Sequence, residues 1–138
     1  MSMSWRPGWG DFPVGLRDFW TERHLCTLTT LYADGRPHVV AVGVALDHEW
    51  ECAWVITTGG SAKARQAARD PRVSAGAVDG GRWSSLEGRA EVLTDRASVA
   101  RAEERYAARY RVPRENPERV ALRITVERFL ASRALLER

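Results

Sequence analysis

The segment TTGGSAKAR, residues 57–65, has the residue types and spacing that suit an anion site. Its lysine, Lys63, is the only lysine of the chain; the other twenty of the twenty-one basic residues are arginine. A Gly-Gly pair lets the backbone approach a ligand closely, and the first turn of a following helix offers free N–H groups and the positive end of a dipole. The pattern predicts a site for a phosphate monoester. Its side-chain donors are those of Thr57, Thr58, Ser61 and Lys63.

One alternative leaves this segment without a ligand: Ser61 only caps a helix, and Lys63 is a solvated surface residue. The segment is not a P-loop, because it lacks the four-residue gap followed by Gly-Lys-Ser/Thr. The chain also shows no Ser/His/Asp or Cys/His arrangement for nucleophilic catalysis, so no catalytic side chain is predicted.

The cysteines and histidines do not form a metal-binding pattern. Cys26 and Cys52 each lie in an apolar stretch, which predicts two buried free thiols. The histidines at 24, 38 and 48 are not paired at i,i+4, and no ligand spacing surrounds the cysteines. We therefore expect no metal.

Length, composition and charge indicate one ordinary globular domain. The chain has 138 residues, 44% apolar and 28% charged. The net charge is +3, and the arginines are scattered, so we expect a small-molecule ligand rather than a nucleic acid. The opening MSMSWRPGWGDF has no basic or apolar targeting region, and no run approaches the ~20 apolar residues of a membrane span. We expect a cytoplasmic protein that does not associate with a membrane.

The pattern along the chain predicts six strands, with short helices between them. The strands are expected at 24–32, 37–46, 51–58, 72–79, 82–93 and 119–132, and the helices at 13–23, at 62–68 and from Asp95 to about Tyr110. Ser61 and Asp95 are the predicted N-caps of the second and third helices. Asp34-Gly35 marks a hairpin turn, and Gly88 is a candidate β-bulge. Residues 1–12 are expected to be an irregular N-terminal arm, followed by one domain over 13–138.

Six mostly antiparallel strands predict a small closed barrel, since closure removes sheet edges. Side chains fill the interior of such a barrel, so a sizeable ligand must bind outside it, at a subunit interface. The run PHVVAVGVAL, 37–46, is apolar or small on both faces. Such a strand is buried on both sides, by the barrel interior on one and by a ligand or a second subunit on the other. We therefore expect a homodimer.

Longer stretches carry a family resemblance. The order DGRPHVVAV, VITTGGSAKARQAARDPRV, RWSSLEGRAEVL and RVALRITVERFLA resembles the flavin/deazaflavin oxidoreductase superfamily, the relatives of pyridoxamine 5′-phosphate oxidase. The segments ERHLCTLTTL, DGGRWSSLEGRA and RYAARYRVPRENPERV are similar to the F420-dependent biliverdin reductase group within it. The resemblance covers about residues 24–136. It implies a mainly β fold, a six-stranded antiparallel split β-barrel with short peripheral helices, and a dimer that binds FMN or coenzyme F420 between two barrels.

The resemblance also implies cofactor-binding residues in three segments. The phosphate segment comprises Thr57, Thr58, Gly59, Gly60, Ser61, Ala62, Lys63 and Ala64. The strand beside the tricyclic ring comprises His38, Val39, Val40, Ala41 and Val42, and the third segment contributes Gly80, Arg82, Trp83 and Ser84.

Several of these side chains have a structural alternative. His38 either lines the ring or donates a proton, or is structural, and Trp83 either covers the cofactor or packs at the dimer seam. Arg82 and Arg89 either meet carboxylates of the substrate or are solvated. On the predicted third helix, Tyr106 and Tyr110 are interpreted as packing residues and Arg109 as a surface charge.

Two departures from the pattern of pyridoxamine phosphate oxidases bear on the expected substrate. The phosphate segment has Ser61-Ala62-Lys63 where pyridoxamine phosphate oxidases show Ser-Arg-Lys, and the chain ends RFLASRALLER without their Arg-Leu-His-type substrate motif. Both features disfavour pyridoxine phosphate as substrate. The expected function is hydride transfer from reduced coenzyme F420 to a conjugated substrate, a tetrapyrrole such as biliverdin. The alternatives are an FMN-dependent oxidase or reductase of the same fold, and a non-catalytic flavin- or tetrapyrrole-binding protein.

Overall fold

Runs of β-branched and apolar residues form one antiparallel sheet. The computed structural model describes residues 2–137, and that part of the chain contains eight strands. They are β1 (Ser2–Trp5), β2 (Cys26–Leu31), β3 (Pro37–Val42), β4 (Ala45–Asp47), β5 (Cys52–Thr58), β6 (Arg72–Asp79), β7 (Arg82–Leu93) and β8 (Arg119–Ser132). The sheet order is β3-β2-β6-β7-β8-β5-β4, with β1 added on β8. The predicted antiparallel, mainly β class is confirmed, although the strands number eight rather than six.

One bent run of chain closes the sheet. Strands β3 and β4 are the two ends of the strand order, yet only Gly43 and Val44 separate them in the chain. This run pairs with β2 through β3 and with β5 through β4, so the single strand expected at 37–46 is wrong. A Cβ on Gly43 would lie 2.7 Å from Cε2 of Tyr106, which explains why the bend carries a residue without a side chain.

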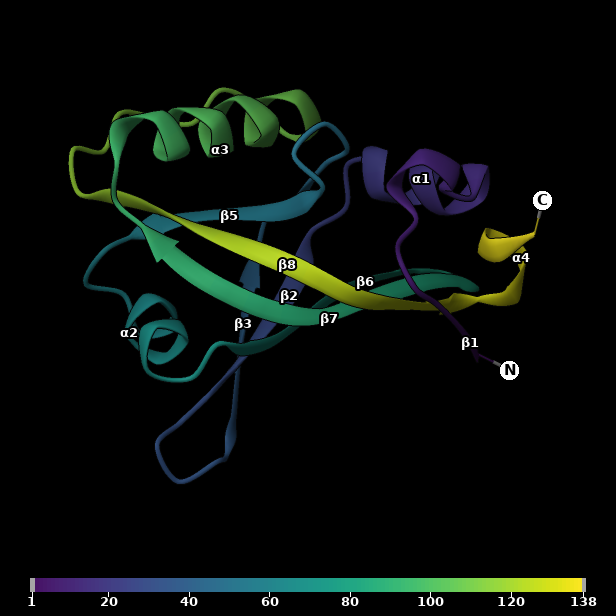
Figure 1. Cartoon of the computed structure of the whole chain (residues 1–138), viewed down its shortest axis with the longest axis horizontal. Helices are drawn as coiled ribbons and strands as arrows, with labels where there is room; N and C mark the ends of the chain where they lie inside the picture. Colours follow the sequence, from purple (N-terminus) through teal and green to yellow (C-terminus); the bar gives the residue numbers. More distant parts are fainter. Residues whose placement is uncertain (1, 138) are drawn as a thin grey trace.

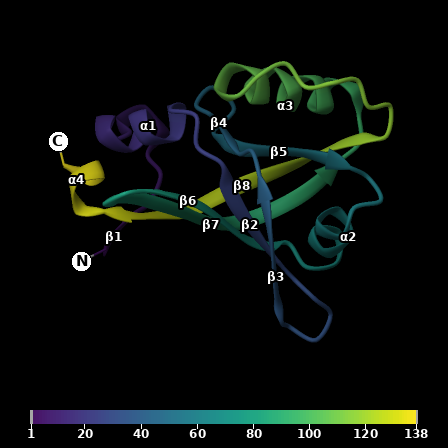
Figure 2. The ribbon, with the colours of Figure 1, turned by 180° about the vertical axis from the view of Figure 1, so that it is seen from behind.

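The helices cover the ends and one side of the barrel. They are α1 (Val14–Thr21), α2 (Ala62–Arg69), α3 (Arg96–Arg109) and α4 (Arg133–Leu136), with a 3-10 turn at Trp9–Asp11. Helix α3 lies along β5, α2 packs against β2 and β7, and α1 lies beside α4 near the two chain ends (Figures 1 and 2). The predicted caps are confirmed: Ser61 accepts from the Ala64 N–H at 3.3 Å, and Asp95 accepts from the Ser98 N–H at 3.0 Å.

Alternate residues of the long strands fill the barrel interior. The largest fully buried apolar side chains of the main core are those of Phe129, Leu28, Leu86, Leu122 and Ile124 from the strands and Leu16 and Phe19 from α1. Trp54 packs in a separate cluster with Cys52, Ala102 and Ala121. Cys26 and Cys52 are both buried and unpaired, as predicted. The bulge predicted at Gly88 is also confirmed, because the β7–β8 register shifts between Glu87 and Gly88, where any Cβ would overlap the Thr125 carbonyl.

The N-terminal arm is more regular than predicted. Strand β1 pairs antiparallel with β8, so the expected irregular arm is wrong for Ser2–Trp5. The Trp5 ring lies 4.7 Å from the Phe12 ring and 5.9 Å from the Phe129 ring, so the arm extends the apolar core. Four residues are too few for strand periodicity to be read from the sequence. In residues 2–137, no helix is long and apolar enough to cross a membrane.

Candidate cofactor site

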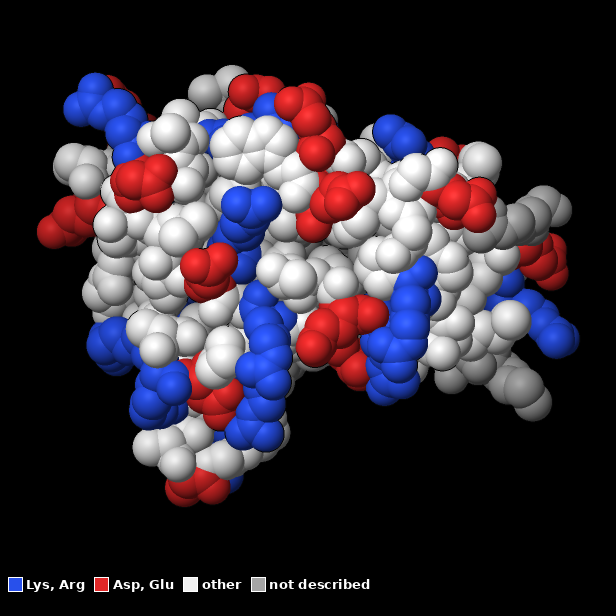
Figure 3. Space-filling view, in the orientation of Figure 1, with Lys and Arg blue, Asp and Glu red and all other residues white. Residues whose placement is uncertain are grey.

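A groove of ≈ 690 Å³ lies where β3 and β5 meet α2, α3 and the loop that precedes β8. We call it the basic groove. Its lining residues are Leu25, Ala41, Val42, Gly43, Ile56, Thr57, Thr58, Lys63, Tyr106, Arg111, Pro113, Arg114, Asn116 and Arg119. Four of these are cations and none is an acid. Charges on the face shown in Figure 3 are mixed instead, with Lys and Arg among Asp and Glu.

The start of α2 positions the ammonium group in this groove. The Thr57 hydroxyl donates to the Ser61 hydroxyl at 3.0 Å, which joins the end of β5 to the helix cap. Lys63 follows in the first helical turn and is half-buried, and burial lowers its pKa from the ordinary lysine value. No carboxylate of the described chain pairs with it. A desolvated, unpaired ammonium supports the ligand-binding interpretation over the solvated one.

The loop before β8 brings in charges that the sequence interpretation missed. Asn116 Nδ2 donates to the Thr58 hydroxyl at 3.0 Å, and the Gly59 N–H donates to the Glu118 carbonyl at 2.9 Å. These bonds hold the loop against the end of β5. The basic stretch RYRVPR, 109–114, was a visible signal, but its place beside the phosphate segment depends on tertiary structure.

Only one of the groove cations is neutralised by the protein. Arg119 bonds to Glu103 at 2.7 Å. For Lys63, Arg111 and Arg114 the structure gives no acidic partner within residues 2–137. Three unpaired cations on one concave surface favour a ligand with more than one anionic group.

A second recess continues from the groove across Leu25, which lines both. It has a volume of ≈ 420 Å³ and lies over β2, β6 and β7, with Trp83 and Ser84 in its lining. The Ser84 hydroxyl accepts from Trp20 Nε1 at 2.9 Å and donates to the Leu130 carbonyl at 3.0 Å. Ser84 is therefore committed to the core, whereas the half-buried Trp83 lies at the recess.

The structure brings only part of the predicted set to these two hollows. The predicted residues that line them are Ala41, Val42, Thr57, Thr58, Lys63, Trp83 and Ser84. Those that line neither are His38, Val39, Val40, Gly59, Gly60, Ser61, Ala62, Ala64, Gly80 and Arg82. His38 instead lies 3.5 Å from the Thr30 hydroxyl, with its ring 5.2 Å from that of Tyr32. Those contacts support its structural alternative.

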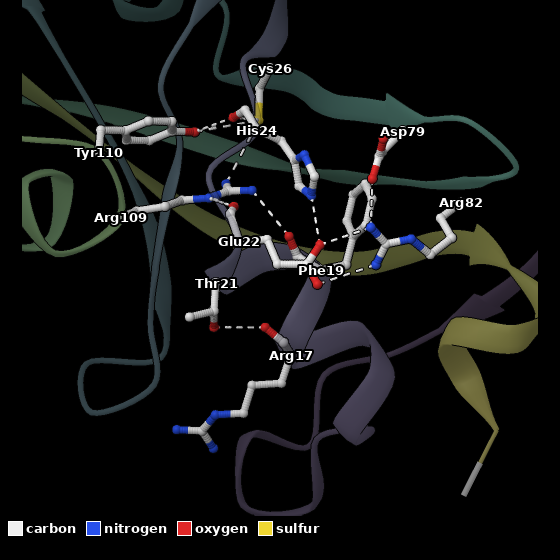
Figure 4. A network of polar contacts seen from close by, with 10 residues as sticks. All are labelled: Arg17, Phe19, Thr21, Glu22, His24, Cys26, Asp79, Arg82, Arg109 and Tyr110. Atoms are coloured by element: carbon white, nitrogen blue, oxygen red, sulfur yellow. Dashed lines mark hydrogen bonds and ion pairs between the residues drawn. The ribbon is translucent and has the colours of Figure 1, made fainter.

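Arg82 is held by acids of the same chain. It donates to Glu22 at 3.0 Å and to Asp79 at 2.6 Å (Figure 4). The hydrogen bonds from Arg82 and His24 lower the pKa of Glu22. Because two carboxylates of the same chain neutralise its guanidinium, Arg82 is a poor candidate for binding an anionic ligand.

Arg109 and Tyr110 anchor the end of α3. The prediction of a surface charge at Arg109 is wrong, since the residue is 7% exposed and donates to the carbonyls of Glu22, Val44 and Phe19 at 2.8, 2.6 and 3.3 Å. The Tyr110 hydroxyl donates to the His24 carbonyl at 2.7 Å, and burial raises its pKa (Figure 4). This anchor places Tyr106 and the following loop on the groove wall.

Comparison with known proteins agrees with this architecture. A family model described as pyridoxamine 5′-phosphate oxidase matches residues 14–133. A Mycobacterium tuberculosis protein named F420H(2)-dependent biliverdin reductase is 55% identical over 120 residues, which are 87% of this chain and 88% of that protein. This chain is therefore its homologue.

Solved structures show the same fold. A conserved hypothetical protein from Mycobacterium tuberculosis superimposes with a TM-score of 0.70 and 31% identity, covering 81% of this chain and 78% of the other. A structure titled F420 reductase has a TM-score of 0.69 and 23% identity, covering 85% of this chain and 97% of the other.

Proposed function

The chain belongs to the pyridoxamine 5′-phosphate oxidase family, and from this premise we propose that it is an oxidoreductase that uses reduced coenzyme F420. The observation that carries the proposal is the basic groove, in which Lys63, Arg111 and Arg114 have no acidic partner among the described residues. The homologue named F420H(2)-dependent biliverdin reductase supports the choice of cofactor, and it makes biliverdin, a conjugated tetrapyrrole, the substrate we propose.

The donor set fits the anionic groups of this coenzyme. Lys63, with the hydroxyls of Thr57 and Thr58, would hold the phosphate. Arg111 and Arg114 would meet the carboxylates of the glutamate tail. FMN has a phosphate but no such tail, so it would leave both arginines unpaired.

The remaining wall of the groove suits a flat ring. Ala41, Val42 and Gly43 come from β3 and its bend, Ile56 from β5 and Tyr106 from α3. These residues would orient the ring and exclude water from it. Reduced F420 supplies a hydride from C5 of its deazaflavin ring, so no protein nucleophile is required.

We also propose that a second copy of the chain completes the site. Leu25, Val39 and Val78 are 72, 56 and 76% exposed, although each belongs to or borders the strands next to the two hollows. Exposed apolar side chains beside a ligand groove are typical of an interface. A stable homodimer would bury more than ~1,200 Å² in total.

Calorimetric titration of one preparation with F420 and with FMN tests the cofactor. We expect the Kd for F420 to be at least about tenfold lower, the effect of one added charged contact. Biliverdin turnover is then followed by its absorbance with reduced F420 present. Preference for FMN would contradict the cofactor, and tight binding of F420 without turnover would favour a binding protein.

A further inference from the structure

A second hollow, separate from the basic groove, lies between α1, β4 and α3. Its volume is ≈ 270 Å³, and it shares no lining residue with the groove. We call it the α1–α3 pocket. It is lined by Arg17, Trp20, Thr21, Ala45, Leu46, His48, Arg105, Ala108 and Arg109. Three arginines line a small space without any carboxylate.

Two buried polar atoms in this pocket lack a partner. Across the described part of the chain, the buried side-chain nitrogens and oxygens without a hydrogen bond are His48 Nδ1 and Arg105 Nε. Both residues line the α1–α3 pocket. Because buried polar groups are nearly always paired in folded proteins, two orphans in one hollow indicate a missing ligand.

The positive charge of the pocket is also uncompensated. Arg109 is bonded to backbone carbonyls rather than to an acid. The Arg17 guanidinium points away from the Glu22–Arg82 ion pair (Figure 4). Asp47, the acid beside His48 in the chain, is bound by Arg101 at 2.7 and 2.8 Å. Within residues 2–137, no carboxylate lines the pocket.

We propose that the α1–α3 pocket binds a compact oxyanion, inorganic phosphate or a small phosphate monoester, through Arg17, Arg105 and His48. The anion accepts from the guanidinium N–H groups and from the imidazole N–H, which pairs both orphan nitrogens. It bridges α1 to α3, and α3 carries Tyr106 of the basic groove. Burial and the charges of Arg17 and Arg105 lower the pKa of His48 to about 4, which agrees with a strongly positive pocket.

The test titrates inorganic phosphate at constant ionic strength into the Lys63→Ala variant, which lacks the groove ammonium. Since the chain has three histidines, the ring nitrogens of His48 can be followed separately by NMR. We expect a saturable change at His48 and a higher thermal unfolding midpoint. Adding Arg105→Gln weakens this binding by about tenfold or more, the loss of a charge-assisted bond.

Arg96→Gln is the matched control, because Arg96 is exposed on the same helix and outside the pocket. It leaves phosphate affinity unchanged. The Arg105 side chain makes no hydrogen bond or ion pair with a described residue, so Arg105→Gln keeps its unfolding midpoint in phosphate-free buffer, and Arg17→Gln repeats the test at a second position. Glycerol 3-phosphate in place of phosphate shows whether an ester binds more tightly than the free ion. No saturable change at His48, or equal affinity in Arg105→Gln, overturns the proposal.

Discussion

Asn116 Nδ2 donates a hydrogen bond of 3.0 Å to the Thr58 hydroxyl, and this bond joins the loop before β8 to the end of β5. The Oδ1 atom of the same side chain accepts from the Glu118 N–H at 3.0 Å. One amide thus fixes the turn of the loop and its contact with the phosphate segment. The relationship explains how Arg111 and Arg114 come to face the same groove as Lys63.

The variant Asn116→Asp tests this arrangement. It keeps an oxygen for the Glu118 N–H, loses the donor to Thr58 and adds a negative charge to a groove that has none. We expect the Kd for F420 to rise by about tenfold or more. The measurement is calorimetry, with Glu115→Gln as a control in the same loop but outside the groove. An unchanged Kd in Asn116→Asp would contradict the assignment of the groove.

The two loop arginines predict cofactor selectivity. In the double variant Arg111→Gln, Arg114→Gln, we expect F420 to lose about tenfold or more in affinity, since charged contacts are typically worth about 1.5–3 kcal/mol each. FMN binding changes by less than about twofold, within ordinary surface effects. The salt dependence of F420 binding also decreases. Equal losses for both cofactors would show that these arginines do not distinguish them.

Local signals in the sequence were enough for much of the fold. Ser61 and Asp95 cap their helices because a hydroxyl or carboxylate before an apolar-periodic run satisfies free N–H groups in any context. The bulge at Gly88 was predictable because a glycine inside a long strand often marks a bulge or a close approach of the backbone. These features depend on neighbours in the chain alone.

Features set by distant contacts were not predictable in this way. The bend at Gly43 depends on Tyr106, and the burial of Arg109 depends on carbonyls 65 to 90 residues away in the chain. The charge of Arg82 is neutralised by Glu22, which is 60 residues away. For the same reason the sequence indicated Lys63 as a candidate but not the loop arginines opposite it.

Dimerisation is tested on the exposed apolar face. Val78 is 76% exposed on β6 and lines the recess that continues the groove. We expect a dimer by light scattering at micromolar concentration, and Val78→Glu to shift it toward monomer because a charge is then buried at the interface. Val14→Glu is the control, since Val14 is 71% exposed on α1 and lines neither hollow. A fully active monomer would contradict the interface.

The lowered pKa of His48 predicts that the folded protein loses stability at acid pH. Its pKa is about 4 in the folded protein, against 6.5 for an ordinary histidine. The unfolded chain therefore binds more protons between these values, and stability present at neutral pH is lost as pH falls from about 6.5 to 4. Because the His48 ring is only half-buried, solvent screening keeps this loss to about 1–2 kcal/mol.

Urea unfolding across this pH range, in phosphate-free buffer, measures the effect. The charged groups facing His48 are Arg17 from α1, Arg105 and Arg109 from α3, and its neighbour Asp47. We expect His48→Gln to flatten this part of the stability profile, while His38→Gln leaves it in place. If the free energy of unfolding falls with pH equally in wild type and in His48→Gln, the effect belongs to carboxylates and not to His48.

Lys63 is the residue on which the cofactor site depends most directly. A charged hydrogen bond to the phosphate is typically worth about 1.5–3 kcal/mol, so Lys63→Ala should raise the Kd of the cofactor by about 10- to 150-fold. Lys63→Met keeps the apolar stem and removes only the charge, so a similar loss in this variant assigns the effect to the ammonium. Lys63→Arg recovers part of the affinity, since a planar guanidinium does not reproduce a compact ammonium.

Measurements of stability and turnover distinguish a cofactor-binding role of Lys63 from a structural role. Burial lowers the pKa of Lys63, which means that the folded protein disfavours its charged form, so Lys63→Met unfolds no more readily than wild type at neutral pH. The rate at saturating cofactor also stays nearly unchanged, because the phosphate contact is the same in the ground and transition states. Arg69→Met, at the other end of α2 and outside the groove, is the control, because the Arg69 guanidinium bonds to the Leu31 carbonyl and not to the phosphate segment. If Lys63→Met binds F420 as tightly as wild type does, the ammonium holds no ligand and the phosphate lies elsewhere.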